Sequence, residues 1–388
     1  MKPQTFVSLF PFLSAPRPNG SRSLTRTVEA VQAWLENKSI PVHSHRFTLR
    51  PCFMELLGLW LGSTGLLLPV AALARWGWGG LILALLALGI PLLEIRFLCP
   101  AITLLVRQPA QNLIAFFPAS HPTREALFCA HLDSKTELLD HYRRQILLRL
   151  SLPAMALALV CEALIAAETI WPAEVLRWLA FLTGLPAAVY GLGMGANLVG
   201  GRFSRRPSTG AVDNGAAVAA LLALARQLHR RELGLEHTAV TLLFTVGEEA
   251  QMQGALAYVR DRKEWPLPAQ AVNLEVLGQN GGYLLWEEDG TVMQRMAVDP
   301  ALNRALERAV EAVTGKQPVR EKLNSSDACA FLQQGIPAAT LGSFDAALGN
   351  RGLHSAMDHP GRVDPDRLNE AVVVLGRFLT DLDKAQAV

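Results

Sequence analysis

The sequence lacks the residue patterns of several common active sites, and each absence excludes a class of protein. Its five cysteines show no C-x-x-C spacing, so neither a disulfide framework nor a thiolate zinc site is indicated. The chain contains no G-x-S-x-G turn of serine hydrolases and no H-E-x-x-H zinc helix. With a net charge of +2, no basic face and no aromatic platform, it does not predict nucleic-acid binding.

Charged residues are also scarce, at 18% of the 388 residues against 51% hydrophobic residues. The scarcity is greatest in four apolar runs, at residues 56–74, 76–93, 150–167 and 178–201. Each run is about as long as a helix needs to cross the ~30 Å hydrocarbon core of a bilayer. We therefore predict two transmembrane hairpins, at residues 52–93 and 147–201. The alternative is a set of buried helices in a soluble protein.

The arginines near these runs predict how the chain is oriented. Both hairpins return the chain to its starting side, so residues 1–51, 94–146 and 202–388 can form one discontinuous domain there. Eight arginines flank the hairpins on that side: Arg50, Arg96, Arg143, Arg144, Arg149, Arg202, Arg205 and Arg206. The hairpin turns carry only Arg75 and Arg177. The positive-inside rule then predicts an integral protein of a bacterial inner membrane, with about four transmembrane helices and a cytoplasmic catalytic domain.

Outside the hairpins, short apolar runs alternate with helical patterns. The predicted strands include residues 126–130, 239–246, 271–276 and 338–341, and the predicted helices include 24–37, 215–228, 254–262, 300–313 and 364–382. Strands interleaved with helices predict an α/β fold with a mixed, largely parallel sheet and helices on both faces.

Acids and histidines gather where these strands end. They are His131 and Asp133, Asp213, the pair Glu248 and Glu249, Glu275, and His354 with Asp358. Each has an ordinary alternative, as a core histidine, a helix cap, a solvated strand end or a loop residue. Open α/β sheets bind ligands beyond the carboxyl ends of their strands, so these residues could converge. Together they would suit two divalent ions, of which zinc is the best match.

The motifs also occur in a recognisable order. H-x-D-S is followed by D-N-G-A-A, G-E-E, N-L-E, S-D with G-I-P-A, and finally H-S-x-x-D. This order resembles that of the co-catalytic zinc aminopeptidases, metallopeptidase family twenty-eight, over nearly all of the chain outside the hairpins. No single motif would suffice. The resemblance implies an α/β zinc-peptidase domain that uses two zinc ions.

The resemblance also implies a role for each of the five metal ligands. His131 and Glu275 would hold one zinc ion, while Glu249 and His354 would hold the other. Asp213 would bridge the two ions through its two carboxylate oxygens. Glu275 departs from the family, which more often has aspartate there. His131 and Asp213 are unusually far apart in sequence, and the second hairpin explains this as an insertion between two ligand loops.

The remaining predicted roles are proton transfer, the orientation of the ligands and stabilisation of the transition state. Glu248 would be the general base that takes a proton from the attacking water. Asp133 would orient His131, and Asp358 would do the same for His354. We find no tyrosine in the expected places to stabilise the oxyanion, so Asn324 or Ser325 would do so, or a zinc ion alone. Asp327 is a further candidate near the substrate, unless Ser326-Asp327 is simply a turn.

The function that these expectations favour is a membrane-anchored zinc aminopeptidase acting on peptides with a free N-terminus. Its partners would be the peptide substrate and the lipid bilayer, without nucleic acid. Three alternatives stay open. The first is a related amidohydrolase or a glutaminyl-cyclase-like enzyme, which would use one zinc ion. The second is a non-catalytic scaffold of the same fold, like the transferrin receptor. The third is a transporter or membrane-complex subunit, suggested by Glu55, Glu94 and Glu162.

Overall fold

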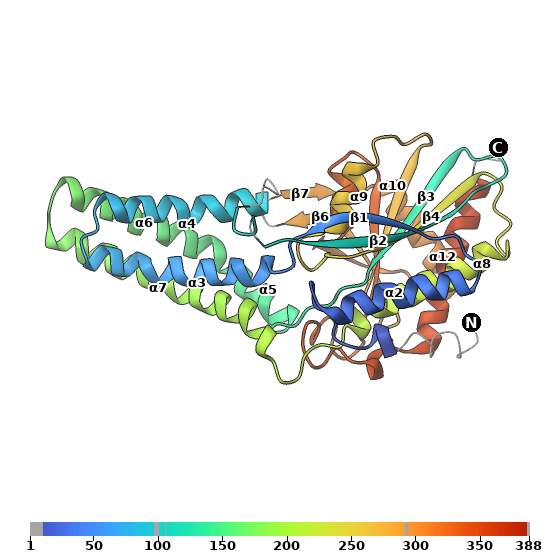
Figure 1. Ribbon diagram of the computed structural model, residues 1–388, viewed down its shortest axis with the longest axis horizontal. Helices are drawn as coiled ribbons and strands as arrows, with labels where there is room; N and C mark the ends of the chain where they lie inside the picture. Colours follow the sequence, from blue (N-terminus) through green and yellow to red (C-terminus); the bar gives the residue numbers. More distant parts are fainter. Residues whose placement is uncertain (1–10, 97–100, 105, 292–293, 386–388) are drawn as a thin grey trace. The chain divides into compact units, whose positions relative to one another are not determined.

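The computed structural model describes residues 11–96, 101–104, 106–291 and 294–385 (Figure 1). The chain divides into two compact units. The sheet unit comprises residues up to 51, 107–135 and those from 208 on, and the helical unit comprises 52–106 and 136–207. The predicted division had grouped residues 94–106, 136–146 and 202–207 with the sheet. In the structure the described residues of these segments fall in the helical unit. Glu137, for example, accepts a hydrogen bond from Asn197 Nδ2 at 2.8 Å.

The sheet unit is built on a mixed sheet. Its strands run in the order β1-β2-β4-β3-β5-β9-β6-β7, with β8 paired to β6. The strands are β1 (His43–Leu49), β2 (Gln108–Phe117), β3 (Arg124–His131), β4 (Thr238–Thr245), β5 (Ala269–Glu275), β6 (Gly282–Thr291), β7 (Gln294–Ala297), β8 (Val319–Asn324) and β9 (Ala338–Phe344). The mixed α/β fold is therefore as predicted.

The sheet is less parallel than the sequence indicated. Its centre, β4-β3-β5-β9, is parallel, but β1 and β2 at one side and β6 and β7 at the other pair antiparallel. The central strands are covered on both faces and read as continuous apolar runs, which is the pattern that indicates parallel pairing. Edge strands such as β1, with the sequence HSHRFTL, contain more polar and fewer apolar residues than the central strands. The direction in which they pair was therefore not evident from the sequence.

Helices cover both faces of the sheet. One core contains residues from α2 (Arg22–Asn37), α8 (Ala216–His229), α10 (Pro300–Thr314) and α12 (Pro365–Lys384). The other contains residues from α9 (Gln253–Asp261) and α11 (Ala328–Leu332). Successive residues of β3 alternate between them: Phe128 packs in the first, with its ring edge-on to Phe378, and Cys129 packs in the second.

The register of the central strands aligns the ends that carry the candidate site. His131, the last residue of β3, pairs with Thr245, the last residue of β4. On the other side of β3, Cys129 pairs with Asn273, so Glu275 lies two residues further along β5, level with His131. Parallel pairing thus brings the three carboxyl ends to one edge of the sheet.

The helical unit consists mainly of two helix pairs. They are α3 (Phe53–Leu73) with α4 (Trp78–Arg96), and α6 (Ser151–Ile170) with α7 (Glu174–Gly200), and the shorter α5 (His141–Arg149) precedes α6. Among the described residues, three helices are long and apolar enough to cross a membrane: Phe53–Leu73, Ser151–Ile170 and Glu174–Phe203. The fourth predicted run falls in α4, whose apolar stretch Trp78–Pro91 is shorter.

Small residues let α3 and α7 pack closely. A Cβ atom on Gly191 would lie 2.4 Å from the carbonyl oxygen of Leu61, and one on Gly195 would lie 2.5 Å from that of Gly58. Both distances are far below van der Waals contact, so only glycine fits at either position without moving the helices apart. This is the kind of helix contact that small residues permit in membranes.

We expect Gly191→Ala and Gly195→Ala each to lower the free energy of unfolding by about 1–3 kcal/mol, the usual cost of overpacking. Thermal unfolding of the detergent-solubilised protein, followed by tryptophan fluorescence, would measure it. Gly193→Ala is the matched control, because a Cβ atom there meets nothing within 4 Å. Equal melting temperatures for all three variants would contradict the close contact.

Candidate metal centre

Two groups of acids and histidines meet at the carboxyl edge of the sheet. His131, Asp213 and Glu275 form one group, and Asp213, Glu249 and His354 form the other. Within each group the possible ligand atoms all lie within 4.8 Å of one another. The five residues that the sequence singled out as metal ligands are therefore brought together, in the two sets that the resemblance implied. Their roles as ligands stay a prediction.

The distances within the groups suit a small divalent ion. His131 Nε2 lies 3.2 Å from Asp213 Oδ1 and 3.5 Å from Glu275 Oε2. In the other group, His354 Nε2 lies 3.1 Å from Asp213 Oδ2 and 2.9 Å from Glu249 Oε1. Ligand atoms about 2.0–2.1 Å from a tetrahedral zinc ion lie roughly 3.3–3.4 Å from each other. Asp213 presents a different oxygen to each group, as a bridging carboxylate must.

The Asp213 loop is held by its neighbours. Asn214 donates from Nδ2 to the carbonyl of Leu274 at 2.7 Å and accepts from the backbone N–H of Val276 at 3.2 Å, which ties the loop to the end of β5. The carboxylate of Asp358 accepts hydrogen bonds from the N–H of Val212 at 2.8 Å and from Ser208 Oγ at 3.0 Å. Asp358, predicted to orient His354, thus holds the loop that carries Asp213.

Asp133 also holds a loop in place, the turn that follows β4. Its carboxylate accepts hydrogen bonds from the backbone N–H groups of Gly247, Glu248 and Glu249, at 2.9, 3.3 and 3.0 Å. The hydrogen-bond partner of His131 Nδ1 is instead the backbone carbonyl of Asp133, at 3.1 Å, with the carboxylate 3.7 Å away. The predicted orienting contact therefore comes from the main chain, because the side chain is occupied by the turn after β4.

That turn directs two adjacent carboxylates to different places. Glu249 reaches His354, whereas Glu248 Oε2 lies 3.8 Å from His131 Nε2, beside the first group but outside both. Burial raises the pKa of Glu248 well above its ordinary value; His131 opposes the increase, and the carboxylates of Glu249 and Glu275 add to it. Bound cations would favour the charged form that a general base needs.

The candidates on the β8 side are less directly connected to the two groups. Asn324 ends β8 and is half-buried, and Ser325 is exposed, so their contact with a substrate oxyanion stays a prediction. Asp327 is fully buried, and its Oδ2 accepts a hydrogen bond from Thr245 Oγ1 at 2.5 Å. Burial raises the pKa of Asp327 to about 7. The Asp327 side chain thus connects the end of β4 to the segment that follows β8.

Three residues that support the site were not found from the sequence. Asn19 donates to Asp133 Oδ2 at 2.8 Å, and Arg17 is fully buried against the loops that carry His131 and Asp213. Asp289 accepts hydrogen bonds from the N–H and the hydroxyl of Ser326, at 3.0 and 2.6 Å. Asn19 lies in the segment PRPNGS and Asp289 in WEEDGT, both of which look like exposed turns, so composition gave no signal.

Acids and histidines that meet at the carboxyl edge of a parallel sheet have the chemistry to hold metal ions for a hydrolytic reaction. Residues 194–378 match the family model of Peptidase family M28, whose members are zinc-dependent peptidases and related enzymes. Over this range the sequence matches that family, as the resemblance of the motifs implied. The match includes Asp213, Glu248, Glu249, Glu275 and His354, while His131 precedes it. No curated protein matches the chain by sequence.

Solved structures share the fold at low sequence identity. A glutaminyl cyclase from Fimbriiglobus ruber superposes with a TM-score of 0.55 at 15% identity, covering 97% of this chain and 93% of its own. A leucine aminopeptidase precursor from Bacteroides thetaiotaomicron gives 0.55 at 14%, covering 97% and 95%. A Zn-dependent exopeptidase from Parabacteroides distasonis gives 0.56 at 13%, covering 97% and 96%. These similarities establish the fold alone.

Proposed function

We propose that this protein is a membrane-anchored zinc aminopeptidase, which removes residues from the N-termini of peptides. The observation that carries the proposal is the pair of ligand groups that share Asp213, with the carboxylate of Glu248 beside them. His131 supplies the first group with an imidazole. The aminopeptidase and exopeptidase among the similar structures support the activity by analogy.

The residues of this chain divide the chemistry between them. Zinc ions, when bound, would polarise the scissile carbonyl and lower the pKa of the attacking water. Glu248 takes the proton from that water and delivers it to the leaving amine. Asp133 keeps Glu248 and Glu249 apart by holding the three N–H groups of their turn. Asn273 donates from Nδ2 to Glu275 Oε1 at 3.1 Å and orients that ligand.

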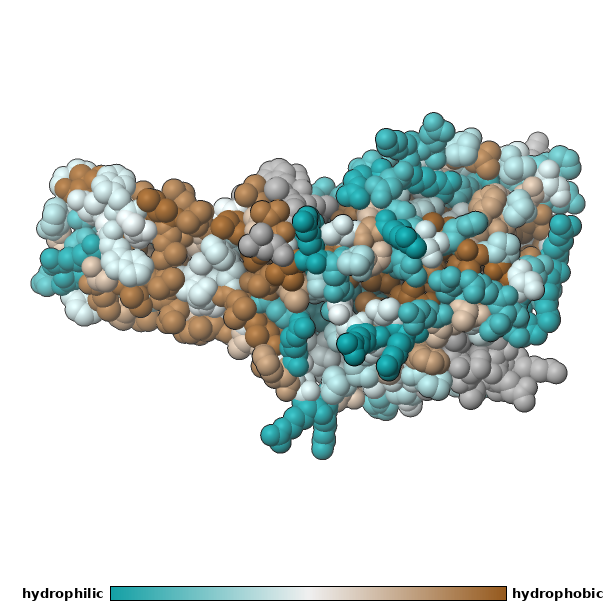
Figure 2. Space-filling model, viewed as in Figure 1, coloured by the Kyte–Doolittle hydropathy of each residue, from teal (hydrophilic) through white to brown (hydrophobic). Residues whose placement is uncertain are grey.

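The helical unit supports the membrane part of the proposal. Apolar side chains are more than half exposed on each of its four long helices; examples are Leu59, Leu85, Leu152 and Val189. Figure 2 shows this surface in brown along the helices. Exposed apolar side chains in such numbers are costly in water and favourable in lipid. Two hairpins placed in a bilayer would bury them.

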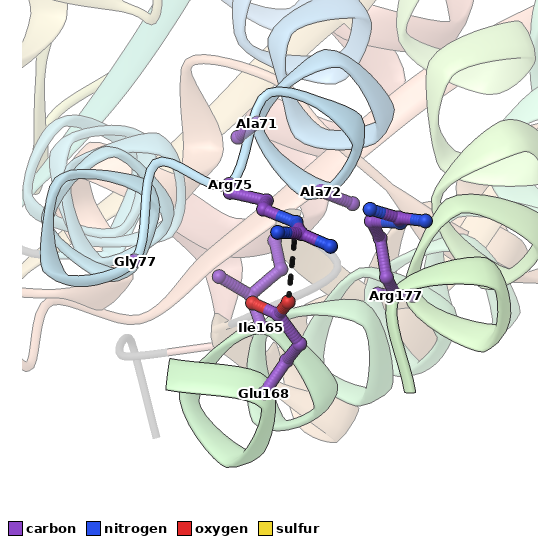
Figure 3. A pocket seen from close by; sticks show the side chains of 8 residues that line it. Ala71, Ala72, Arg75, Gly77, Ile165, Glu168 and Arg177 are labelled. Atoms are coloured by element: carbon purple, nitrogen blue, oxygen red, sulfur yellow. Dashed lines mark ion pairs between the residues drawn. The ribbon is translucent and has the colours of Figure 1, made fainter. Parts of the chain in front are cut away.

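The charged ends of the helices support the predicted orientation. At the turn end, Arg75 faces Glu168 of α6 with 3.8 Å between Nε and Oε1, and Arg177 of α7 lines the same hollow (Figure 3). Arg177 donates to Glu174 at 2.6 Å. At the other end of α7, Arg205 and Arg206 are exposed. In the sequence, eight arginines flank the hairpins at that end and two lie in the turns, and this excess supports a cytoplasmic position for that end.

Fusions at the C-terminus test this orientation. We expect alkaline phosphatase fused after Val388 to be inactive and green fluorescent protein at the same point to be fluorescent. A control fusion in the α6–α7 turn, after Trp171, should give the reverse result. Active phosphatase at the C-terminus would place the catalytic domain outside the cytoplasm.

A glutaminyl-cyclase-like reaction is the second candidate, because a glutaminyl cyclase is among the structures that share the fold. It would use one metal ion, held by Asp213, Glu249 and His354. The placement of His131 with Glu275 around the other oxygen of Asp213 favours two ions, and hence the peptidase.

One experiment separates the two candidates. We expect purified protein in detergent to contain two zinc ions per chain and to hydrolyse aminoacyl and peptide substrates that have a free N-terminus, but not their N-acetylated forms. One zinc ion with cyclisation of N-terminal glutamine would support the cyclase. A zinc-loaded protein without activity on either panel would contradict both.

A further inference from the structure

We propose that Arg17 is a positioning residue, which locks together the two loops that carry His131 and Asp213 and so keeps the metal centre assembled. The proposal rests on the metal centre described above. It concerns a third segment, residues 13–19, which lies far from both loops in sequence. Nothing in the family match covers this segment, because the match begins at residue 194.

The guanidinium of Arg17 makes contacts that no other residue type could reproduce. It is 0% exposed and donates to five main-chain carbonyls, those of Leu13, Ala15, Leu132, Thr209 and Gly210, at 2.6–2.9 Å. A buried cation is costly unless its donors are satisfied, and these carbonyls satisfy the planar fork of N–H groups. Lysine offers three donors from one point and cannot span the same set.

The main chain of Arg17 completes the contact with the first loop. Its N–H donates to Ser134 Oγ at 2.8 Å, and its carbonyl accepts from the N–H of Ser134 at 3.0 Å. Leu132 and Ser134 stand on either side of Asp133, directly after His131. Any shift of this loop would leave buried donors unpaired, which is unfavourable.

The loop that carries Asp213 is also tightly constrained. Gly210 has φ +62°, and a Cβ atom on it would lie 2.4 Å from Ser134 Cβ and 2.8 Å from Arg17 Nη2. The loop therefore passes directly over the first loop and the guanidinium. Because Asp213 follows Gly210 closely in the sequence, this contact helps to fix the backbone position from which the Asp213 carboxylate extends.

The two loops are separated in the sequence by a long insertion. Residues 136–207, which form most of the helical unit, connect Ser134 to Thr209. The ends of the insertion contact each other, as when Asn197 Nδ2 donates to Glu137 at 2.8 Å, but neither residue belongs to the loops that carry His131 and Asp213. Arg17 bonds to the loop before the insertion and to the loop after it. It thus holds His131 and Asp213 in register independently of the inserted helices.

Hydrogen exchange and zinc affinity test the proposal on the full-length protein in detergent. We expect Arg17→Met to speed amide exchange in residues 131–135 and 208–213 by at least tenfold, while β4 and β5 stay protected. Zinc affinity, measured by competition with a chelator, should fall about 10–100-fold, the range seen when residues supporting metal ligands are changed. Arg17→Lys should resemble Arg17→Met. Arg26→Met, at an exposed arginine of α2, should match wild type.

Ser134→Ala is the milder variant, in case Arg17→Met does not fold. It removes one hydrogen bond of the lock, and we expect faster exchange in the same two loops. Wild-type exchange and wild-type zinc affinity in both Ser134→Ala and Arg17→Lys would overturn the proposal. Wild-type protein that binds no zinc would instead contradict the metal centre, and the exchange rates would still decide the role of Arg17.

Discussion

Glu248→Gln should lower kcat for hydrolysis of N-terminal peptide bonds by roughly 10²–10⁴-fold, the usual contribution of a general base. The carboxamide has nearly the shape of the carboxylate but cannot accept the proton of the attacking water. Zinc content should stay at the wild-type value, because Glu248 lies beside the first ligand group and is not a member of either group. Steady-state kinetics with metal analysis of the same sample would measure both.

The control for this variant is Glu264→Gln, which makes the same change at an exposed acid. It should keep wild-type kcat and metal content. If Glu248→Gln retained most of its activity, another group would have to move the proton. If it lost zinc together with activity, Glu248 would be a ligand and the division of roles in the Glu248–Glu249 pair would be wrong.

Asp213→Ala should affect both ions at once, and this is the second large effect. Because its two oxygens face His131 and His354 at 3.2 and 3.1 Å, its removal takes one ligand from each group. We expect zinc affinity at both sites to fall by more than about 100-fold, since changes behind the ligands alone cost 10–100-fold. Metal content after equilibration with a chelator should fall from two ions per chain to less than one.

Glu275→Ala provides the comparison, because Glu275 belongs to one group only. It should leave one ion per chain, held by Asp213, Glu249 and His354. Asp366→Ala, at an exposed acid in the first turn of α12, should keep both. Equal metal contents for Asp213→Ala and Glu275→Ala would show that Asp213 does not bridge.

Three of the five candidate ligands could be predicted from the sequence because they stand at or after the ends of strands of the parallel centre. Apolar runs such as the one before Glu248 indicate buried strands, and parallel strands end at one edge, so the convergence of His131, Glu249 and Glu275 follows from topology. The two ligand sets came from the resemblance. The antiparallel outer strands were missed because pairing direction is not encoded in a polar edge strand.

The supporting residues could not be predicted, for a different physical reason. The role of Arg17 depends on carbonyl groups of segments more than a hundred residues away, and carbonyl groups carry no sequence signal. Asp133 was recognised as a polar residue near a ligand, but its three bonds to the turn at residues 247–249 depend on the strand register. Side-chain contacts to main-chain atoms are therefore the part of this site that required the structure.

If the proposed function holds, the position of the second helix pair between His131 and Asp213 also determines when the protein can first become active. Translation delivers His131 before α6 and α7, and Asp213 only after them, so neither ligand group exists while that hairpin is entering the bilayer on the proposed topology. His354, near the end of the chain, completes the second group. On the proposed function, zinc would therefore be acquired only after membrane integration, and the nascent chain would be incapable of proteolysis at the translocation machinery.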